Sequence, residues 1–459
     1  MTDFNPAQSP ADGAKPVVVV SEMEPEAKAG LGAWWMVIVL LVCYIVAILD
    51  RLVLVMLVEP MKLDLGLTDF EISLLLGPAF GLFYAIFGFP LAWASDRFSR
   101  RKVIAFGLTL WSVATMLCGA AGSFLSIFAA RMGVGIGEAA LSPAAYSLIG
   151  DRFPRQLLTR ALAIYALGPR LGVAVAYTAG ALVIAYSTSL GPISLPLIGL
   201  TKPWQLSFII VGLPGIFLAL ALFTFREPGR RVSTASLAER DSTVLGFVSE
   251  NKKLTTLLLL GFASVSVASG ADSWVPSYFA RRFDWQPLQF GPAMSVISLV
   301  AAGSILIKGS IVDWLYSRGL KDAHMRFYTW LLGPAAVLSA IAFFLPNPFV
   351  FLGVLCVIQV ITMGYLVYMA AVIQIITPLH LRGRMTALFL FATTMGVAFG
   401  PMAVGWITDF VFRDPQLVGG SLGIVLTATP VIALVAFRAA LPLLPPHIAR
   451  RGDASRTGS

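Results

Sequence analysis

The 459-residue chain is poor in charge, since only 12% of its residues are Asp, Glu, Lys or Arg, while 58% are hydrophobic and the mean hydropathy is +0.83. Soluble domains carry about 25% charged residues. This shortage excludes an ordinary soluble enzyme or binding domain. Apolar runs of about 20 residues recur along nearly the whole chain, and each is long enough to cross a bilayer core of roughly 30 Å. We therefore predict an integral membrane protein.

Cysteine and histidine are scarce as well. The three cysteines lie inside apolar runs and provide neither a disulfide framework nor a CxxC metal spacing. The three histidines fall between the runs or in the tail: His324, His380 and His447. A proton carrier within the membrane would then have to be a carboxylate. The sequence contains no nucleotide-binding loop, metal-ligand cluster or serine–histidine arrangement. We expect no metal and no cofactor, and the sequence argues against an enzyme or a signalling receptor.

Loop charge predicts the orientation of the chain. We count twelve spans: 34–58, 72–94, 103–123, 125–149, 161–187, 205–225, 254–279, 290–313, 327–345, 348–377, 385–411 and 419–444. The loops after even-numbered spans hold 18 Lys or Arg residues, and those after odd-numbered spans hold five. Because basic loops stay in the cytoplasm, both termini are predicted to be cytoplasmic. The short tails and lean loops favour a bacterial inner membrane.

The longest hydrophilic interruption, 226–253, divides the spans into two sets of six, which is the pattern of a duplicated transporter. We predict an all-α membrane protein built from two pseudo-symmetric six-helix bundles. Residues 236–253 are expected to form a short amphipathic helix on the inner membrane surface. The predicted units are a cytoplasmic tail 1–33, a bundle 34–225, a cytoplasmic linker 226–253, a bundle 254–444 and a cytoplasmic tail 445–459.

The first span contains an acidic and a basic residue side by side, Asp50 and Arg51. An ionisable residue at membrane depth costs at least a few kcal/mol, so it faces the protein interior or a water-filled cavity and usually marks a pathway. Consecutive helical residues point about 100° apart. Asp50 and Arg51 therefore each need a partner from another helix.

Span four carries Arg131 and Glu138, which are seven residues apart and so share one helix face, roughly 10 Å from each other. These two residues either have a role in the protein's function or belong to a buried ion pair that holds span four to span one. Span five adds a third cation, Arg170. A lone basic residue of this kind can also have a purely structural role. Three arginines against two carboxylates leave one positive charge for an anionic ligand group.

The second half is aromatic, aliphatic and hydroxylic apart from Asp272 and Lys308. Trp274 lies in span seven, and Tyr365 and Tyr368 are i, i+3 neighbours in span ten. These aromatic side chains either line a substrate cavity or pack between helices.

The loop after span two reads Ala92-Trp-Ala-Ser-Asp-Arg-Phe-Ser-Arg-Arg-Lys102. It is similar to the signature loop of the major facilitator superfamily, with Ala92 and Ser99 in place of two glycines. The second half repeats the glycine and aspartate as Gly309 and Asp313. The resemblance implies a cytoplasmic gate, and the alternative is an ordinary positive cluster that orients the helix. The candidate gate residues are Asp96, Arg97, Arg100, Arg101, Asp313 and Arg318.

The residues quoted from spans one, four and seven resemble the Spinster branch of that superfamily, which is associated with lysophospholipids and sphingosine-1-phosphate. The resemblance implies a proton-coupled transporter that works as a monomer in the lipid bilayer, without nucleic acid. Asp50 and Glu138 become proton-coupling candidates. We also expect that protonation of Asp50 releases Arg51 from an ion pair. The substrate-binding candidates are Arg51, Arg131, Arg170, Trp274, Tyr365 and Tyr368.

Three alternatives remain open from the sequence. One is a proton/drug antiporter of the same fold, and a second is an organic-anion antiporter. The third is a lipid facilitator that uses no proton gradient.

Overall fold

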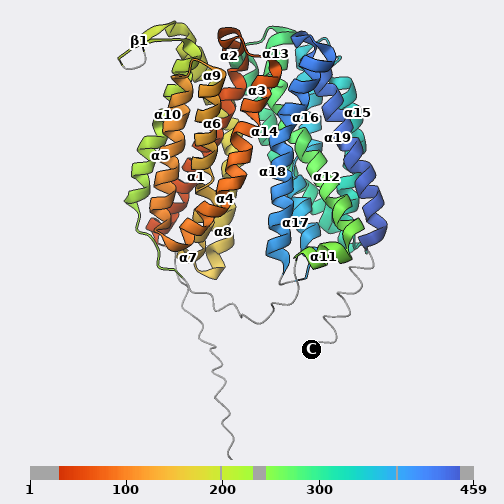
Figure 1. Cartoon of the computed structure of the whole chain (residues 1–459). Helices are drawn as coiled ribbons and strands as arrows, with labels where there is room; N and C mark the ends of the chain where they lie inside the picture. Colours follow the sequence, from red (N-terminus) through yellow and green to blue (C-terminus); the bar gives the residue numbers. More distant parts are fainter. Residues whose placement is uncertain (1–29, 197–198, 231–243, 379–380, 445–459) are drawn as a thin grey trace, which may run out of the picture.

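The computed structural model describes residues 30–196, 199–230, 244–378 and 381–444. Within them, twelve helical segments are long and apolar enough to cross a membrane. The predicted fold class, an all-α membrane protein of two six-helix bundles, is confirmed (Figure 1). The predicted terminal tails lie almost wholly outside the described residues, and so does the middle of the linker. The domain limits stay a prediction.

The N-terminal bundle holds the first six spans. Spans two, four and five are each divided between two helices, and two short antiparallel strands follow span five. Its elements are α1 (Leu31–Met56), α2 (Val58–Leu65), α3 (Asp69–Leu76), α4 (Pro78–Arg97), α5 (Arg100–Gly119), α6 (Phe124–Glu138), α7 (Leu141–Arg152), α8 (Arg155–Ala166), α9 (Gly168–Leu190), β1 (Ile193–Leu195), β2 (Gly199–Thr201) and α10 (Pro203–Ala221).

The C-terminal bundle holds the other six. Its helices are α11 (Val244–Glu250), α12 (Lys252–Ala271), α13 (Val275–Phe283), α14 (Pro287–Ser317), α15 (Ala323–Ala342), α16 (Pro348–Thr362), α17 (Tyr365–Ile376), α18 (Arg382–Trp406) and α19 (Val418–Ala440). Of the predicted amphipathic helix, α11 covers the end, and residues 236–243 lie outside the described part of the chain. His324 was expected in a loop, but α15 begins at Ala323 and includes it.

Local sequence explains where several helices begin. Thr68 and Glu71 form a capping box at the start of α3, and the Asn347 side chain accepts hydrogen bonds from the first backbone N–H groups of α16. Proline stands in the first turn of α4, α10 and α14, where its missing N–H costs nothing.

The two ends of the molecule differ. We call the end that carries α11 the linker end, and the end that carries β1 and β2 the hairpin end; they lie at the bottom and top of Figure 1. At the hairpin end one hydrophobic core joins both bundles, with Leu57 and Phe208 from the first and Phe279 and Phe290 from the second. The two remaining cores each belong to one bundle alone.

Polar contacts reinforce closure at the hairpin end. Arg281 of α13 pairs with Glu59 of α2 at 2.8 Å and forms a bidentate pair with Asp69 of α3, at 2.7 and 2.8 Å. The backbone N–H of Phe70 donates to Asp409 at 2.6 Å. The bundles are therefore clamped together at the hairpin end.

Candidate functional site

The four ionisable residues predicted in spans one and four come together in the N-terminal bundle. Arg51 Nε donates to Glu138 Oε2 at 2.6 Å, and Arg51 Nη2 contacts the same oxygen. Asp50, Arg131 and Glu138 are each no more than 2% exposed. The cluster thus contains two acids and two bases whose formal charges cancel, and of the four only Arg51 is partly exposed.

Asp50 and Arg51 each take a partner from another helix, as the sequence predicts, and they form no ion pair with each other. Asp50 accepts a hydrogen bond at 3.3 Å from Thr115 of α5, while Arg51 turns to Glu138 on α6. Adjacent helical residues diverge by about 100°, which sends the two side chains to different helices. The expectation that Asp50 controls the release of Arg51 is therefore revised, because Glu138 is the carboxylate that holds this arginine.

The cluster is incompletely satisfied. Asp50 Oδ1, Glu138 Oε1 and Arg131 Nε are buried and lack hydrogen-bond partners among the described residues. Buried polar atoms without partners are costly, and in native proteins they mark strain or function. The two carboxylate oxygens can each accept a further hydrogen bond or a proton, and Arg131 Nε can donate one further hydrogen bond.

Arg51 connects this cluster to a cavity between the bundles. Its guanidinium lies 4.2 Å from the Phe80 ring centre and 5.3 Å from that of Tyr84. Tyr84 also lines a cavity of about 370 Å³, whose other walls include Tyr146 of α7 and Phe391 of α18. The Tyr84 side chain therefore separates the charged cluster from an apolar, open cavity that residues of both bundles line.

A second, smaller cavity of about 140 Å³ lies in the C-terminal bundle and reaches the first bundle through Arg170. Tyr365, Thr362 and Asp272 also line it, and Asp272 accepts a hydrogen bond from Gln359 Nε2 at 2.9 Å. Arg170 forms no ion pair with the described residues. The spare cation expected from the sequence thus faces a cavity, as an anion-binding residue would.

Span ten is broken beside this cavity. Gly364 adopts φ 98°, a left-handed conformation that suits glycine, and separates α16 from α17. Lys308 of α14 donates to the freed carbonyl oxygens of Val360 and Met363, at 2.7 and 2.5 Å. Broken helices at membrane depth are tolerated where a cavity or a polar partner satisfies the backbone, and transporters often place their sites there.

The other two aromatic candidates lie away from both cavities. Trp274 is fully buried and donates to the Pro401 carbonyl oxygen at 3.0 Å. Tyr368 stacks on Tyr328 with ring centres 4.7 Å apart. Of the aromatic candidates, only Tyr365 lines the cavity that contains Arg170.

The candidate gate residues lie at the linker end, in two separate groups. Arg100 is buried and bonds to Asp151, Ser147 and Glu227, all within the first bundle and the start of the linker. Arg101 donates to the Phe225 carbonyl oxygen. Neither arginine bridges the two bundles in this conformation.

The remaining gate candidates are less constrained. Arg97 lies over the Trp93 ring, and Arg318 over that of Trp314. Asp96 forms no hydrogen bond or ion pair with the described residues. Asp313 lines a pocket together with His324.

Glu227 belongs to the Arg100 network, but the sequence did not suggest it. Burial favours its neutral form, yet hydrogen bonds from Ser99 and Arg100, together with the Arg100 charge, hold the pKa of Glu227 below its ordinary value. Ser99 donates to Glu227 through its hydroxyl. The serine that replaces a family glycine therefore has a structural partner.

The hairpin-end clamp was also missed. Asp69 and Arg281 are 212 residues apart, and both were assigned to external loops. The only signal in the sequence is that the loop after span one carries four acidic residues, Glu59 and Asp69 among them. Among the residues that the structure describes, no group of three or more His, Cys, Asp or Glu side chains could hold a metal ion.

Comparison with known proteins gives a consistent result. The profile of the Major Facilitator Superfamily matches residues 40–401. An MFS-type efflux pump of Mycolicibacterium smegmatis is 27% identical over 413 residues, which cover 88% of this chain and 92% of that protein. A probable L-galactonate transporter of Escherichia coli is 23% identical over 365 residues, 75% of this chain and 76% of the other.

A solved structure agrees in fold. The crystal structure of a bacterial homologue of the human lysosomal transporter Spinster, inward-facing and unoccupied, superposes with a TM-score of 0.74 at 23% identity, covering 92% of this chain and 99% of that one. The resemblance to Spinster proteins noted in the sequence extends to the fold. The chain belongs to the Major Facilitator Superfamily, and it is a membrane transporter of small molecules rather than an enzyme.

Proposed function

We propose that this transporter couples proton movement to the transport of an amphipathic anion of the lysolipid or sphingolipid-like class. The observation that carries the proposal is the asymmetry of the Arg51–Glu138 pair. The Arg51 side chain is 31% exposed, whereas that of Glu138 is 1% exposed. An anionic headgroup can therefore reach the guanidinium without first reaching the carboxylate.

The coupling follows from the energy of buried charge. A phosphate or carboxylate headgroup binds Arg51 with the same bidentate geometry that Glu138 uses. Once Arg51 turns to the headgroup, Glu138 is left as a buried carboxylate without its partner, at a cost of about 3–5 kcal/mol. A proton on Glu138 removes that cost. Binding of the anion and of the proton thus favour each other.

The substrate tail has an apolar space next to this headgroup position. The cavity of about 370 Å³ beside Tyr84 is lined mainly by apolar side chains, including Phe89, Leu390 and Phe391. We assign the acyl chain to this cavity and a second anion contact to Arg170. Tyr365 accompanies Arg170, while Asp50 and Arg131 act as fixed charges around the exchanging pair.

Orientation follows from the loop charges. The linker end faces the cytoplasm, both termini are cytoplasmic, and the protein works as a monomer in a bacterial inner membrane. Alternating access then requires opening of the Arg281 clamp and closure of the linker end. In that closure the exposed Arg97 and Arg318 move towards the opposite bundle, while Arg100 and Arg101 keep the first bundle and the linker together.

A second candidate is an organic-anion transporter. The Escherichia coli relative is named for a sugar acid, and Arg51 and Arg170 would suit any carboxylate. A drug antiporter is the third, since the mycobacterial relative is named an efflux pump. An uncoupled lipid facilitator would have the same cavities without the proton step.

Uptake into proteoliposomes separates these substrates. Labelled lysophosphatidylglycerol, L-galactonate and a cationic dye are tested at equal concentration, with Arg51→Gln as the site variant and the exposed Arg413→Gln as control. We expect lysolipid uptake that Arg51→Gln abolishes and Arg413→Gln preserves. Uptake of galactonate without lysolipid would replace the proposal by the organic-anion transporter. Uptake of the dye alone would replace it by the drug antiporter.

A further inference from the structure

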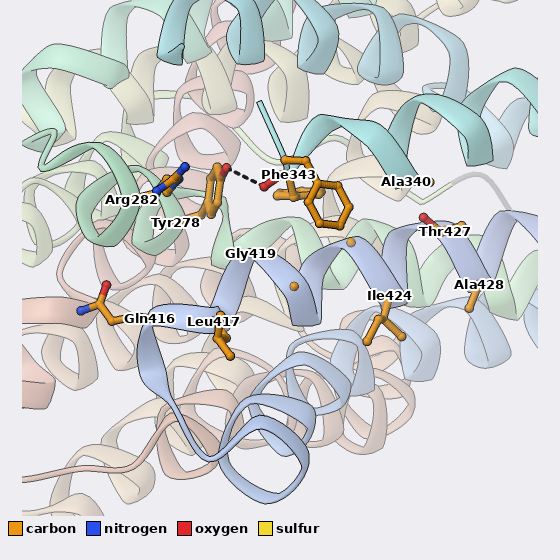
Figure 2. A pocket seen from close by; sticks show the side chains of 13 residues that line it. Tyr278, Arg282, Ala340, Phe343, Gln416, Leu417, Gly419, Ile424, Thr427 and Ala428 are labelled. Carbon is orange, nitrogen blue, oxygen red and sulfur yellow. Dashed lines mark hydrogen bonds between the residues drawn. The ribbon is translucent and has the colours of Figure 1, made fainter. Parts of the chain in front are cut away.

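A groove of about 590 Å³ lies on the C-terminal bundle at the hairpin end (Figure 2). None of its lining residues lines either of the two cavities described above. Ala340 and Phe343 from the end of the α15 span form one side, and Leu417 and Ile424 at the start of α19 form the other. In Figure 1, α19 lies on the side of the C-terminal bundle away from the first bundle. The groove therefore opens towards lipid.

One end of the groove is cationic. Arg282 of α13 lies there beside Tyr278, whose hydroxyl donates to the Phe343 carbonyl oxygen at 3.3 Å (Figure 2). Arg282 is exposed and forms no ion pair with the described residues, in contrast to Arg281, which binds two carboxylates. Gln416 adds a polar side chain at this end.

Glycine keeps the floor of the groove open. Gly419, Gly420 and Gly423 of α19 all line it. A Cβ atom at Gly423 would meet the Phe343 ring at 3.6 Å, which is ordinary contact, so a larger side chain there would fill the groove without striking backbone. The volume falls within the range of about 300–1,000 Å³ typical of small-molecule sites.

We propose that this groove binds an anionic phospholipid from the leaflet at the hairpin end. Its phosphate binds Arg282, whose planar guanidinium suits phosphate oxygens, and one acyl chain lies between α15 and α19. Arg282, which has no ion-pair partner among the described residues, provides the charge complementarity, and the apolar side chains between α15 and α19 suit an acyl chain. This site is separate from the proposed transport site and does not depend on the transported substrate.

Native mass spectrometry of the full-length protein, titrated with phosphatidylglycerol and with phosphatidylcholine, tests the site. Arg282→Gln should lower phosphatidylglycerol affinity about tenfold, since it removes one charge-assisted contact. Phosphatidylcholine affinity should fall less, because the cationic choline already offsets the charge of its phosphate. Gly423→Leu should weaken both lipids by filling the groove. Thermal unfolding of each variant checks that it is folded.

Two matched controls share the same end of the bundle. Arg413→Gln removes another exposed arginine, and Gly353→Leu adds the same side chain where nothing lies within 4 Å. Both should bind as the wild type does. Phosphatidylglycerol affinity that is unchanged in Arg282→Gln, or that falls equally in Arg413→Gln, would overturn the proposal. If Gly423→Leu does not fold, the two arginine variants decide alone.

Discussion

The cations inside the membrane spans have different partners in the two bundles. In the first, Arg51 binds the carboxylate of Glu138, next to the point where span four divides into α6 and α7. In the second, Lys308 binds the neutral carbonyl oxygens of Val360 and Met363, at the corresponding break in span ten. A carboxylate can take up a proton and release its cation, but a carbonyl cannot. This difference favours proton coupling in the first bundle.

The buried acids of spans one and seven make a similar contrast. Asp50 accepts from Thr115 and lies in a cluster with Arg131 and Glu138, whereas Asp272 has Gln359 as its hydrogen-bond partner. Because the groups of a charged cluster titrate together, neutralising one acid changes the electrostatic interaction energy of every other group in the cluster. Neutralising Asp272 changes one hydrogen bond. We therefore expect the second bundle to govern substrate recognition more than coupling.

The largest effect is expected from removing Arg51. Arg51→Gln leaves Glu138 buried without its cation and should lower the free energy of unfolding by about 3–5 kcal/mol. It should also abolish transport. The double variant Arg51→Gln/Glu138→Gln should regain most of the stability but no transport, as measured by denaturant unfolding and proteoliposome uptake. Equal instability of the single and double variants would contradict the pairing.

Opening the hairpin-end clamp should give the next largest effect. Arg281→Gln removes the contacts to Glu59 and Asp69 and should shift the population towards a state open at this end by tenfold or more, since about 1.4 kcal/mol suffices for that. Spin-label distances across the hairpin end measure the shift. Arg282→Gln, its unpaired neighbour, serves as control. Distances that stay unchanged in Arg281→Gln would show that the hydrophobic core closes this end unaided.

Loss of Lys308 should be milder than loss of Arg51. Lys308→Met leaves the Val360 and Met363 carbonyl oxygens without their donor, and the free energy of unfolding should fall by about 1–3 kcal/mol. The response of transport to a pH gradient should persist. If the Lys308→Met protein folded but its transport no longer responded to the pH gradient, residues of both bundles would take part in proton coupling.

The smallest effect concerns Glu227. Its pKa is lower in the folded protein, so its contribution to stability is present above the unfolded-state pKa and disappears as the pH falls through the folded-state pKa. Glu227→Gln should therefore cost less than about 1 kcal/mol at neutral pH, and the difference from wild type should vanish in acid. Thermal unfolding across pH 3–7 measures this difference. A difference that persists at low pH would contradict the assigned role of the Glu227 charge.

The membrane spans and the charged residues within them were predictable, because both follow from local composition. The pairing was predictable only in part. An ion pair between spans one and four was one of the two roles considered for Arg131 and Glu138, but the sequence did not show that Arg51 and Glu138, 87 residues apart, are the residues that form it. The aromatic candidates show the same limit. Trp274 and Tyr365 are equally apolar in sequence, yet only the second reaches a cavity. The sequence identifies the charged and aromatic side chains within the spans. Which residues they contact depends on how each helix is rotated about its own axis in the bundle.

The most direct test of coupling in the first bundle is lysolipid flux in proteoliposomes with and without an imposed pH gradient. Wild type is compared with Glu138→Gln and Asp50→Asn, and Asp272→Asn is the matched control from the second bundle. We predict flux that follows the gradient in wild type and Asp272→Asn, and flux that no longer responds to it in Glu138→Gln. A gradient response that is retained in Glu138→Gln, or one that is lost in Asp272→Asn, would contradict the account.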